Sequence, residues 1–225
     1  MKTNSSSGLR KANAAITEYV DTLLHNAAIW RGSERTPAGT AGIASGFNVF
    51  DETLGGWPPG ALVELIAQRE GIGEVSILLP ALARLSNDER WIALINPPYV
   101  PYAPALFHAG VDLAKVVVIR ATGNTDTLWS MEQALRSGTC SAVLGWPATM
   151  TEQAIRRLQL ATETGGTLGV YFTQPGAAPR TSPVPYRLRI DGSIDNVRVE
   201  VLKRRGGGLT APLHLGPAYK CWRRP

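Results

Sequence analysis

Cysteine and histidine are scarce in this chain, which holds two cysteines and three histidines in 225 residues. Cys140 and Cys221 have no CxxC spacing, so neither a disulfide framework nor a thiolate metal site is indicated, and we expect reduced thiols in a cytoplasmic protein. The histidines are His25, His108 and His214. None has a metal ligand at useful spacing, so we expect surface or packing roles for them and no metal or cofactor.

Long apolar runs are also missing. No stretch approaches the roughly 20 apolar residues that a membrane-spanning helix needs. The start, MKTNSSSGLRK, has no apolar segment behind its basic residues, as a secretory signal would have. We therefore expect neither a membrane association nor a secreted product.

Acidic residues are few near the C-terminal end. Residues 185–225 hold nine Lys or Arg against three Asp or Glu, a net charge of +6 in a chain whose total is +5. A basic end on a nearly neutral body favours binding to a polyanion or to an acidic protein partner, and a solvated surface is the alternative.

An amphipathic helix is predicted over residues 11–30, because apolar residues recur there at steps of three and four and so share one face. The polar stretch 31–42, which contains Pro and Gly, is predicted to be a linker. The chain is thus divided into an N-terminal helix with its linker (1–42), a core (43–217) and a basic tail (218–225).

Short apolar runs rich in β-branched residues alternate with helical patterns through the core. The expected strands are 61–66, 91–95, 116–120, 142–144 and 167–172, and the expected helices are 75–85, 103–109, 125–136 and 151–164. This order predicts an α/β fold with a mostly parallel sheet and helices on both faces. Strict alternation in 187–190 and 197–201 predicts an antiparallel hairpin at the edge, with Arg187, Arg189 and Arg198 facing solvent.

The loop after the first strand has the context of a phosphate-binding loop but lacks its chemistry. Such a loop needs a Lys for the phosphates and a Ser or Thr for magnesium, and no Lys occurs between Lys11 and Lys115. Gly71 and Gly73 supply only backbone freedom. Glu74 would repel a phosphate charge by about 4 kcal/mol at about 4 Å and an effective dielectric of ~20. We predict an inactive nucleotide loop.

Other parts of the core agree with that prediction. The strand ends at 96–98 (NPP) and 144–147 (LGWP) carry no carboxylate, and no GxSxG motif occurs. Pro80 fits only the first turn of a helix without distortion, so the helix after the loop either starts late or kinks. The sequence therefore predicts a protein that acts by binding and not as an enzyme.

Several stretches resemble RecA. Residues 45–67 are similar to its entry strand and loop, and residues 91–120, Gln174 and 197–215 are similar to later parts of its fold. The overlap runs from about residue 45 to residue 217 and implies a RecA-like core. Two relatives keep that fold without the ATP site, the ImuA family and the cell-division inhibitor SulA. The chain resembles ImuA most, through the motifs at 28–32 (AIWRG), 71–74 (GIGE), 78–85 (LLPALARL) and 221–224 (CWRR).

The resemblance to ImuA implies a non-catalytic accessory of damage-inducible, error-prone translesion DNA synthesis, associated with the nucleoid. It implies ImuB, RecA and an error-prone replicative-type DNA polymerase as partners, and single-stranded DNA as a further candidate. The alternative is a SulA-like inhibitor that binds the division GTPase. That function also needs a protein-binding face and no catalysis.

Two surfaces are candidates for these contacts. The N-terminal helix and a strand near Phe47 and Phe50 are expected to dock on a neighbouring RecA-like core, unless the helix packs on its own domain. The apolar anchors expected on the helix are Ile16, Val20, Leu23 and Trp30. The second surface is the basic end, which is expected to contact either DNA or ImuB. Its residues are Lys203, Arg204, Arg205, Lys220, Trp222, Arg223 and Arg224.

Overall fold

The computed structural model describes residues 42–67, 72–173, 181–193, 195–206 and 210–217. These residues belong almost entirely to one compact unit, which spans residues 40–204 and 208–225. The N-terminal helix and the basic tail lie outside the described residues, so they and the division at 42 and 217 stay predictions. The predicted contact residues left outside are Ile16, Val20, Leu23, Trp30, Gly71, Lys220, Trp222, Arg223 and Arg224.

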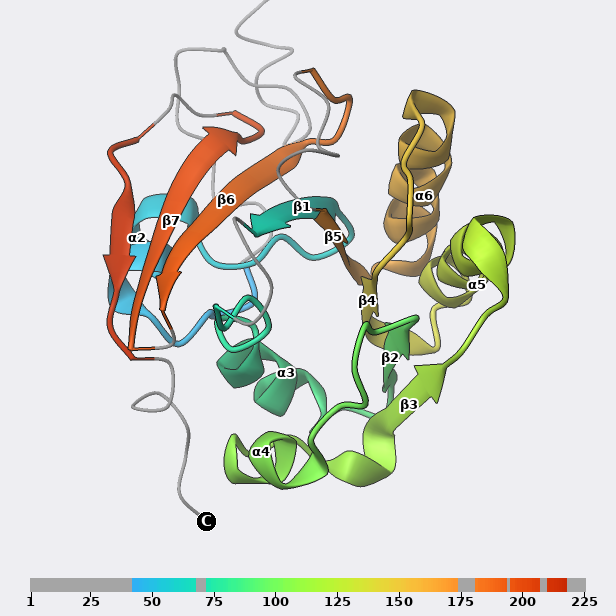
Figure 1. Ribbon diagram of the computed structural model, residues 1–225, viewed down its shortest axis with the longest axis horizontal. Coiled ribbons are helices and arrows are strands. Elements are labelled where there is room, and N and C mark those ends of the chain that lie inside the picture. Colours follow the sequence, from blue (N-terminus) through green and yellow to red (C-terminus); the bar gives the residue numbers. More distant parts are fainter. Residues whose placement is uncertain (1–41, 68–71, 174–180, 194, 207–209, 218–225) are drawn as a thin grey trace, which may run out of the picture. The chain divides into compact units, whose positions relative to one another are not determined.

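Eight strands form one sheet in the order β3-β2-β4-β5-β1-β6-β7-β8 (Figure 1). Their bounds are β1 Leu62–Ala67, β2 Trp91–Ile95, β3 Val116–Ile119, β4 Cys140–Gly145, β5 Leu168–Thr173, β6 Tyr186–Ser193, β7 Asn196–Lys203 and β8 Leu213–Leu215. The ladders from β3 to β6 are parallel, and β7 and β8 are antiparallel to their neighbours. The predicted α/β class is confirmed as a mixed fold, whereas its RecA-like form stays a prediction.

Helices cover both faces of the sheet. Their bounds are α2 Asn48–Leu54, α3 Leu79–Leu85, α4 Ala103–His108, α5 Gly123–Arg136 and α6 Glu152–Gly165, with a short 3-10 helix, η1, at Leu113–Lys115. Met131 of α5 and Leu158 of α6 pack in one apolar cluster on one face. Leu82 of α3 and Phe50 of α2 belong to the larger cluster on the other face. No helix in the described part of the chain is long and apolar enough to cross a bilayer.

The ends of α6 follow the expected capping chemistry. The Thr151 side chain accepts a hydrogen bond from the Ala154 backbone N–H, and Gly166 ends the helix with a left-handed φ of 60°. The predicted cap at Thr151 is therefore confirmed. Helix α5 begins earlier than expected, at Gly123 with Thr122 before it and not at Thr125.

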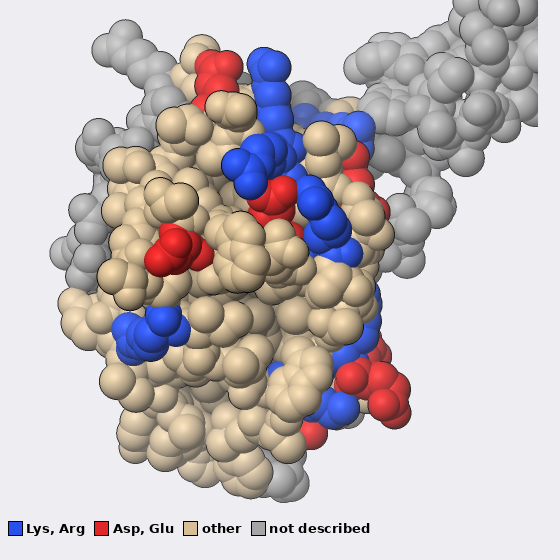
Figure 2. Space-filling view, turned by 90° about the vertical axis from the view of Figure 1, so that its right-hand side faces the viewer, with Lys and Arg blue, Asp and Glu red and all other residues tan. Residues whose placement is uncertain are grey.

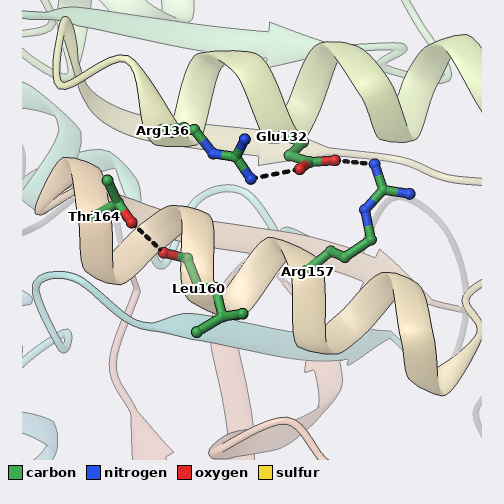
Figure 3. Close-up of polar contacts among 5 residues, drawn as sticks. All are labelled: Glu132, Arg136, Arg157, Leu160 and Thr164. Atoms are coloured by element: carbon green, nitrogen blue, oxygen red, sulfur yellow. Dashed lines mark hydrogen bonds and ion pairs between the residues drawn. The ribbon is translucent and has the colours of Figure 1, made fainter.

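A shared carboxylate ties α5 to α6 (Figure 3). Glu132 of α5 accepts a hydrogen bond from Arg136 at 2.6 Å on the same helix and a second one from Arg157 of α6. The Glu132 side chain is 8% exposed, whereas both arginines are about half exposed. Because the carboxylate is nearly buried and both of its oxygens are bonded, it fixes the two helices to each other at this point.

Three local expectations from the sequence are wrong. The segment around Phe47 and Phe50 is helix α2 and not a strand, and Gly55 ends it in the left-handed conformation with φ 79°. The hairpin β6–β7 lies next to the edge but does not form it, because β8 pairs with β7. Arg187 does not face solvent, because it is buried beside Glu64.

Candidate partner-binding surface

The loop after β1 places apolar side chains where a working phosphate loop would present polar groups. Ile72 is buried in the core, and Gly73 has a left-handed φ of 91°. The Ser76 hydroxyl is already used, because it donates to the Gly73 carbonyl oxygen at 2.5 Å. The carboxylate atom Oε2 of Glu74 is buried and has no hydrogen-bond partner among the described residues.

The helix that follows this loop starts late. Helix α3 begins at Leu79 with Pro80 in its first turn, so the expectation of a delayed or kinked helix is confirmed as a delay. Leu79 and Pro80 are themselves buried. In a working phosphate-binding loop, the first turn of this helix would offer free N–H groups to the phosphate. Here the first turn of α3 is apolar and packed in the core.

An aromatic pair lies at the ends of the neighbouring strands β4 and β5. Trp146 follows β4 and stacks on Phe172 of β5, with ring centroids 4.5 Å apart and planes 7° from parallel. Both rings join the larger core cluster, to which Ile72 also belongs. These residues offer a triphosphate neither a cation nor a metal-holding carboxylate, and the inactivity of the loop at Gly73 and Glu74 stays a prediction.

A buried ion pair joins β1 to β6. Glu64 is fully buried and lies opposite Arg187 in the parallel register, and the Arg187 Nε atom donates to its carboxylate. Thr173 donates to the other Glu64 oxygen at 3.2 Å. Burial and then the Glu64 charge hold the pKa of Tyr171 well above its usual value. This group sets a strand register and is closed to solvent, so it is no partner-binding site.

The two predicted docking residues that the structure describes, Phe47 and Phe50, are not exposed. Phe47 and Phe50 are buried in the core, and Phe50 lies against Trp57 with ring centroids 4.6 Å apart. Their role as exposed anchors for a partner is therefore not supported by the described structure. A short helix that follows Gly46 places them inward, where apolar burial stabilises the fold.

The basic residues that the structure describes are partly used within the fold. The Lys203 Nζ atom donates to the Ser182 carbonyl oxygen at 2.8 Å, and Arg204 donates to the Thr53 carbonyl oxygen at 2.7 Å. Arg205 also has an interaction partner. The Lys203 and Arg204 side chains thus contact the protein's own backbone, which the charge pattern of the sequence could not show.

Exposed apolar side chains concentrate in one stretch that the sequence reasoning missed. Seven of the eleven large apolar side chains that are exposed in the described part of the chain fall between residues 99 and 118. They are Tyr99, Val100, Tyr102, Phe107, Leu113, Val117 and Val118, and we call them the 99–118 surface. The stretch contains the segment after β2, helix α4, η1 and most of β3.

The members of this surface are strongly exposed. Val100 is 82% exposed and Tyr102 is 71% exposed, and no residue of α4 is buried. Figure 2 views the molecule from the side on which α5 and β3 lie in Figure 1, and uncharged residues cover most of that side. Exposed aromatic and branched side chains in such number are typical of surfaces that bind other proteins. A cluster of Tyr and Phe between two strands is the sequence signal that could have indicated it.

These features define an α/β domain that presents exposed apolar side chains in one stretch of the chain. Comparison with known proteins then identifies the family. The sequence model described as "Cell division inhibitor SulA" matches residues 60–169. The cell division inhibitor SulA of Serratia proteamaculans is 32% identical over 122 residues, which cover 54% of this chain and 73% of that protein. The chain belongs to the SulA family.

Other relatives carry the same description. The SulA of Photorhabdus laumondii is 33% identical over 106 residues, 47% of this chain and 60% of that protein. The SulA of Yersinia pestis is 37% identical over 93 residues, 41% of this chain and 55% of that protein. The crystal structure of SulA from Pseudomonas aeruginosa aligns with a TM-score of 0.43 at 24% identity, over 50% of this chain and 97% of that one.

These matches overturn the assignment to the ImuA family. The role in translesion synthesis falls with it, as do ImuB, RecA, an error-prone polymerase and single-stranded DNA as partners. The error has a plain source. Two of the motifs used for ImuA, at 28–32 and 221–224, lie outside the matched residues 60–169, whereas those at 71–74 and 78–85 lie inside them. The latter two therefore did not distinguish the two families, and the basic end was no argument against SulA.

Proposed function

We propose that this protein is a cell-division inhibitor that binds the division GTPase in the cytoplasm and blocks its assembly without catalysis. The proposal rests on one observation, the 99–118 surface, which lies wholly inside the residues matched to the SulA family. An inhibitor of this kind needs a face that a partner can bury. Aromatic side chains such as Tyr102 and Phe107 are the type that contributes most to protein–protein affinity.

The altered loop supports the same function. A protein that inhibits by occupying a partner needs no nucleotide turnover of its own, and Ile72 and Trp146 fill space near the loop with apolar atoms. The functional feature of the fold would then be its surface and not a reaction site. That argument treats the loop at Gly73 and Glu74 as part of the core scaffold.

The test is overproduction in a rod-shaped bacterium with a matched pair of variants. The wild-type chain is expected to give long, undivided cells. The double variant Tyr102→Ser, Phe107→Ser removes two exposed aromatic rings and is expected to restore normal division. The control is Leu160→Ser on α6, which removes an apolar side chain outside the 99–118 surface. Leu160 is 61% exposed, which is close to the 57% of Phe107.

Binding should be measured beside the phenotype. Each aromatic truncation is expected to weaken the affinity for the purified division GTPase about tenfold, the effect of losing about 1.4 kcal/mol. The double variant should keep its thermal unfolding midpoint, because both rings are exposed in the free chain. Normal division under overproduced wild-type protein, or full inhibition by the double variant, would contradict the proposal.

A further inference from the structure

Strand β3 forms one edge of the sheet and pairs only with β2 in the described part of the chain (Figure 1). The Asn96 backbone N–H donates to the Ile119 carbonyl oxygen at 2.9 Å, so the polar backbone groups of Ile119 point towards β2. Neighbouring residues of a strand alternate in direction. The backbone N–H and C=O groups of Val118 therefore point outward, away from the sheet, whereas the Val116 N–H already donates to the Leu113 carbonyl oxygen.

The side chains of β3 are accessible on both faces of the pleat. Val117 lies opposite Ala93 and is 36% exposed, and Val118 lies opposite Leu94 and is 42% exposed. An exposed apolar edge strand can pair with a strand of another chain, and proteins usually protect such edges from this pairing. β3 has no proline, no inward-pointing charge and no covering helix across its outer edge among the described residues.

Positive charges stand at both ends of this edge. Lys115 precedes β3 and Arg120 follows it, and each donates one hydrogen bond to a backbone carbonyl, that of Glu89 at 3.3 Å and that of Pro97 at 2.7 Å. Neither forms an ion pair with a carboxylate in the residues described here. The edge is thus an apolar strand with a cationic side chain, Lys115 or Arg120, at each end.

We propose that the partner binds by adding an extended segment to β3 as a ninth strand, and that this segment is apolar in its centre and acidic at its two ends. Main-chain hydrogen bonds to Val118 would supply affinity, and the flanking charges would set the register. The identity of the partner as the division GTPase rests on the function proposed above.

The same charges argue against a second copy of the chain as the occupant. Antiparallel pairing of β3 with itself, centred between Val117 and Val118, would place Lys115 of one copy opposite Arg120 of the other. Like charges directly opposite each other destabilise a strand pair. The edge is therefore complementary to an acidic segment and repels its own copy.

The test uses one position with two substitutions. Val118→Pro removes the outward N–H but leaves the hydrogen bonds between β3 and β2 in place, and proline is tolerated on an edge strand. Val118→Thr keeps the N–H and the branched shape. Binding to the purified division GTPase should fall at least tenfold for Val118→Pro and no more than about threefold for Val118→Thr. Leu160→Ser should bind as the wild type does.

Amide hydrogen exchange of the wild-type chain gives a second measurement that needs no variant. The amide of Val118 points outward and should exchange quickly in the free chain, and it should become protected in the complex. The double reversal Lys115→Glu, Arg120→Glu should weaken binding at low salt, because it places like charges against an acidic segment.

Each outcome decides the matter. Equal affinity of Val118→Pro and Val118→Thr, or an unprotected Val118 amide in a formed complex, overturns strand addition and leaves the proposed function standing. Tighter binding after the charge reversal overturns the acidic segment. Self-association that Val118→Pro abolishes would make a second copy the occupant. No binding of the wild-type chain to the GTPase overturns the proposed function and the assigned occupant together.

Discussion

Asn96 and Ala121 exchange two hydrogen bonds across the ends of β2 and β3. The Asn96 Oδ1 atom accepts from the Ala121 backbone N–H at 2.7 Å, and its Nδ2 atom donates to the Ala121 carbonyl oxygen at 3.0 Å. Nδ2 also donates to the Thr127 hydroxyl oxygen of α5 at 2.6 Å. The Asn96 side chain thus links the end of the edge strand β3 to the first turn of α5. Asn96 stands at a strand end that carries no carboxylate, and its role there is structural.

Asn96→Ala should therefore destabilise the fold. The substitution removes three side-chain hydrogen bonds. It also places alanine, whose side chain cannot form hydrogen bonds with the nearby backbone, at a left-handed φ of 51°. We expect the free energy of unfolding in urea to fall by about 3 kcal/mol. Asn96→Gly loses the same bonds but tolerates the backbone, so it should be about 1 kcal/mol less damaging than Asn96→Ala. Equal stability of all three chains would contradict this account.

The buried pair of Glu64 and Arg187 should be costly to break on one side only. Glu64→Gln removes the negative charge that balances the buried guanidinium, and we expect a loss of about 3 kcal/mol in chemical unfolding. The double variant Glu64→Gln, Arg187→Met removes both charges and should lose less than the two single variants added together. A strictly additive double-mutant cycle would show that the pair is not coupled.

Tyr171 should make stability fall at alkaline pH. Its pKa is raised in the fold by burial first and by the Glu64 carboxylate second, so the folded state holds its proton more tightly than the unfolded state. The associated stability is present below about pH 10 and is lost as the pH rises above that value. Relative to Tyr171→Phe, the wild type should lose about 1.4 kcal/mol per pH unit in this range. If the free energies of unfolding of the wild type and of Tyr171→Phe change in parallel from about pH 9 to about pH 11, the range around the usual pKa of tyrosine, the prediction is wrong.

Nucleotide should not bind at the loop after β1. Isothermal titration with ATP and magnesium is expected to show no sub-millimolar affinity, because Glu74 replaces a cation and Ile72 is buried in the core. Glu74→Lys should not restore binding, since α3 starts only at Leu79 and Pro80 occupies its first turn. A saturating heat signal with the wild-type chain would reverse the prediction.

Much of the fold could be predicted from local patterns. β2 was placed at its observed bounds, and α6 and its cap at Thr151 followed from a helical period and a hydroxyl at the right position. Helix α2 was missed because its seven residues are too few to show a period. The short β8 was missed because three residues carry no signal apart from their pairing with β7.

The candidate site could be predicted less well than the fold. Charge along the sequence drew attention to Lys203 and Arg204, and only the structure showed that each donates to a backbone carbonyl. Phe47 and Phe50 were expected outside and lie inside, because apolar side chains alone do not say which surface they will cover. The family was misjudged because two of the motifs used lay in residues that the SulA family also matches.

By itself the sequence determined the α/β class, the mainly parallel sheet and the loss of a phosphate-binding cation, since each follows from the spacing or identity of neighbouring residues. Only the tertiary structure decided that Glu64 meets Arg187, that Asn96 holds Ala121, and that Val118 lies on an open edge. The reason is physical. Burial and pairing depend on which distant segments lie side by side, and the free energy that selects those neighbours is a property of the whole packed chain.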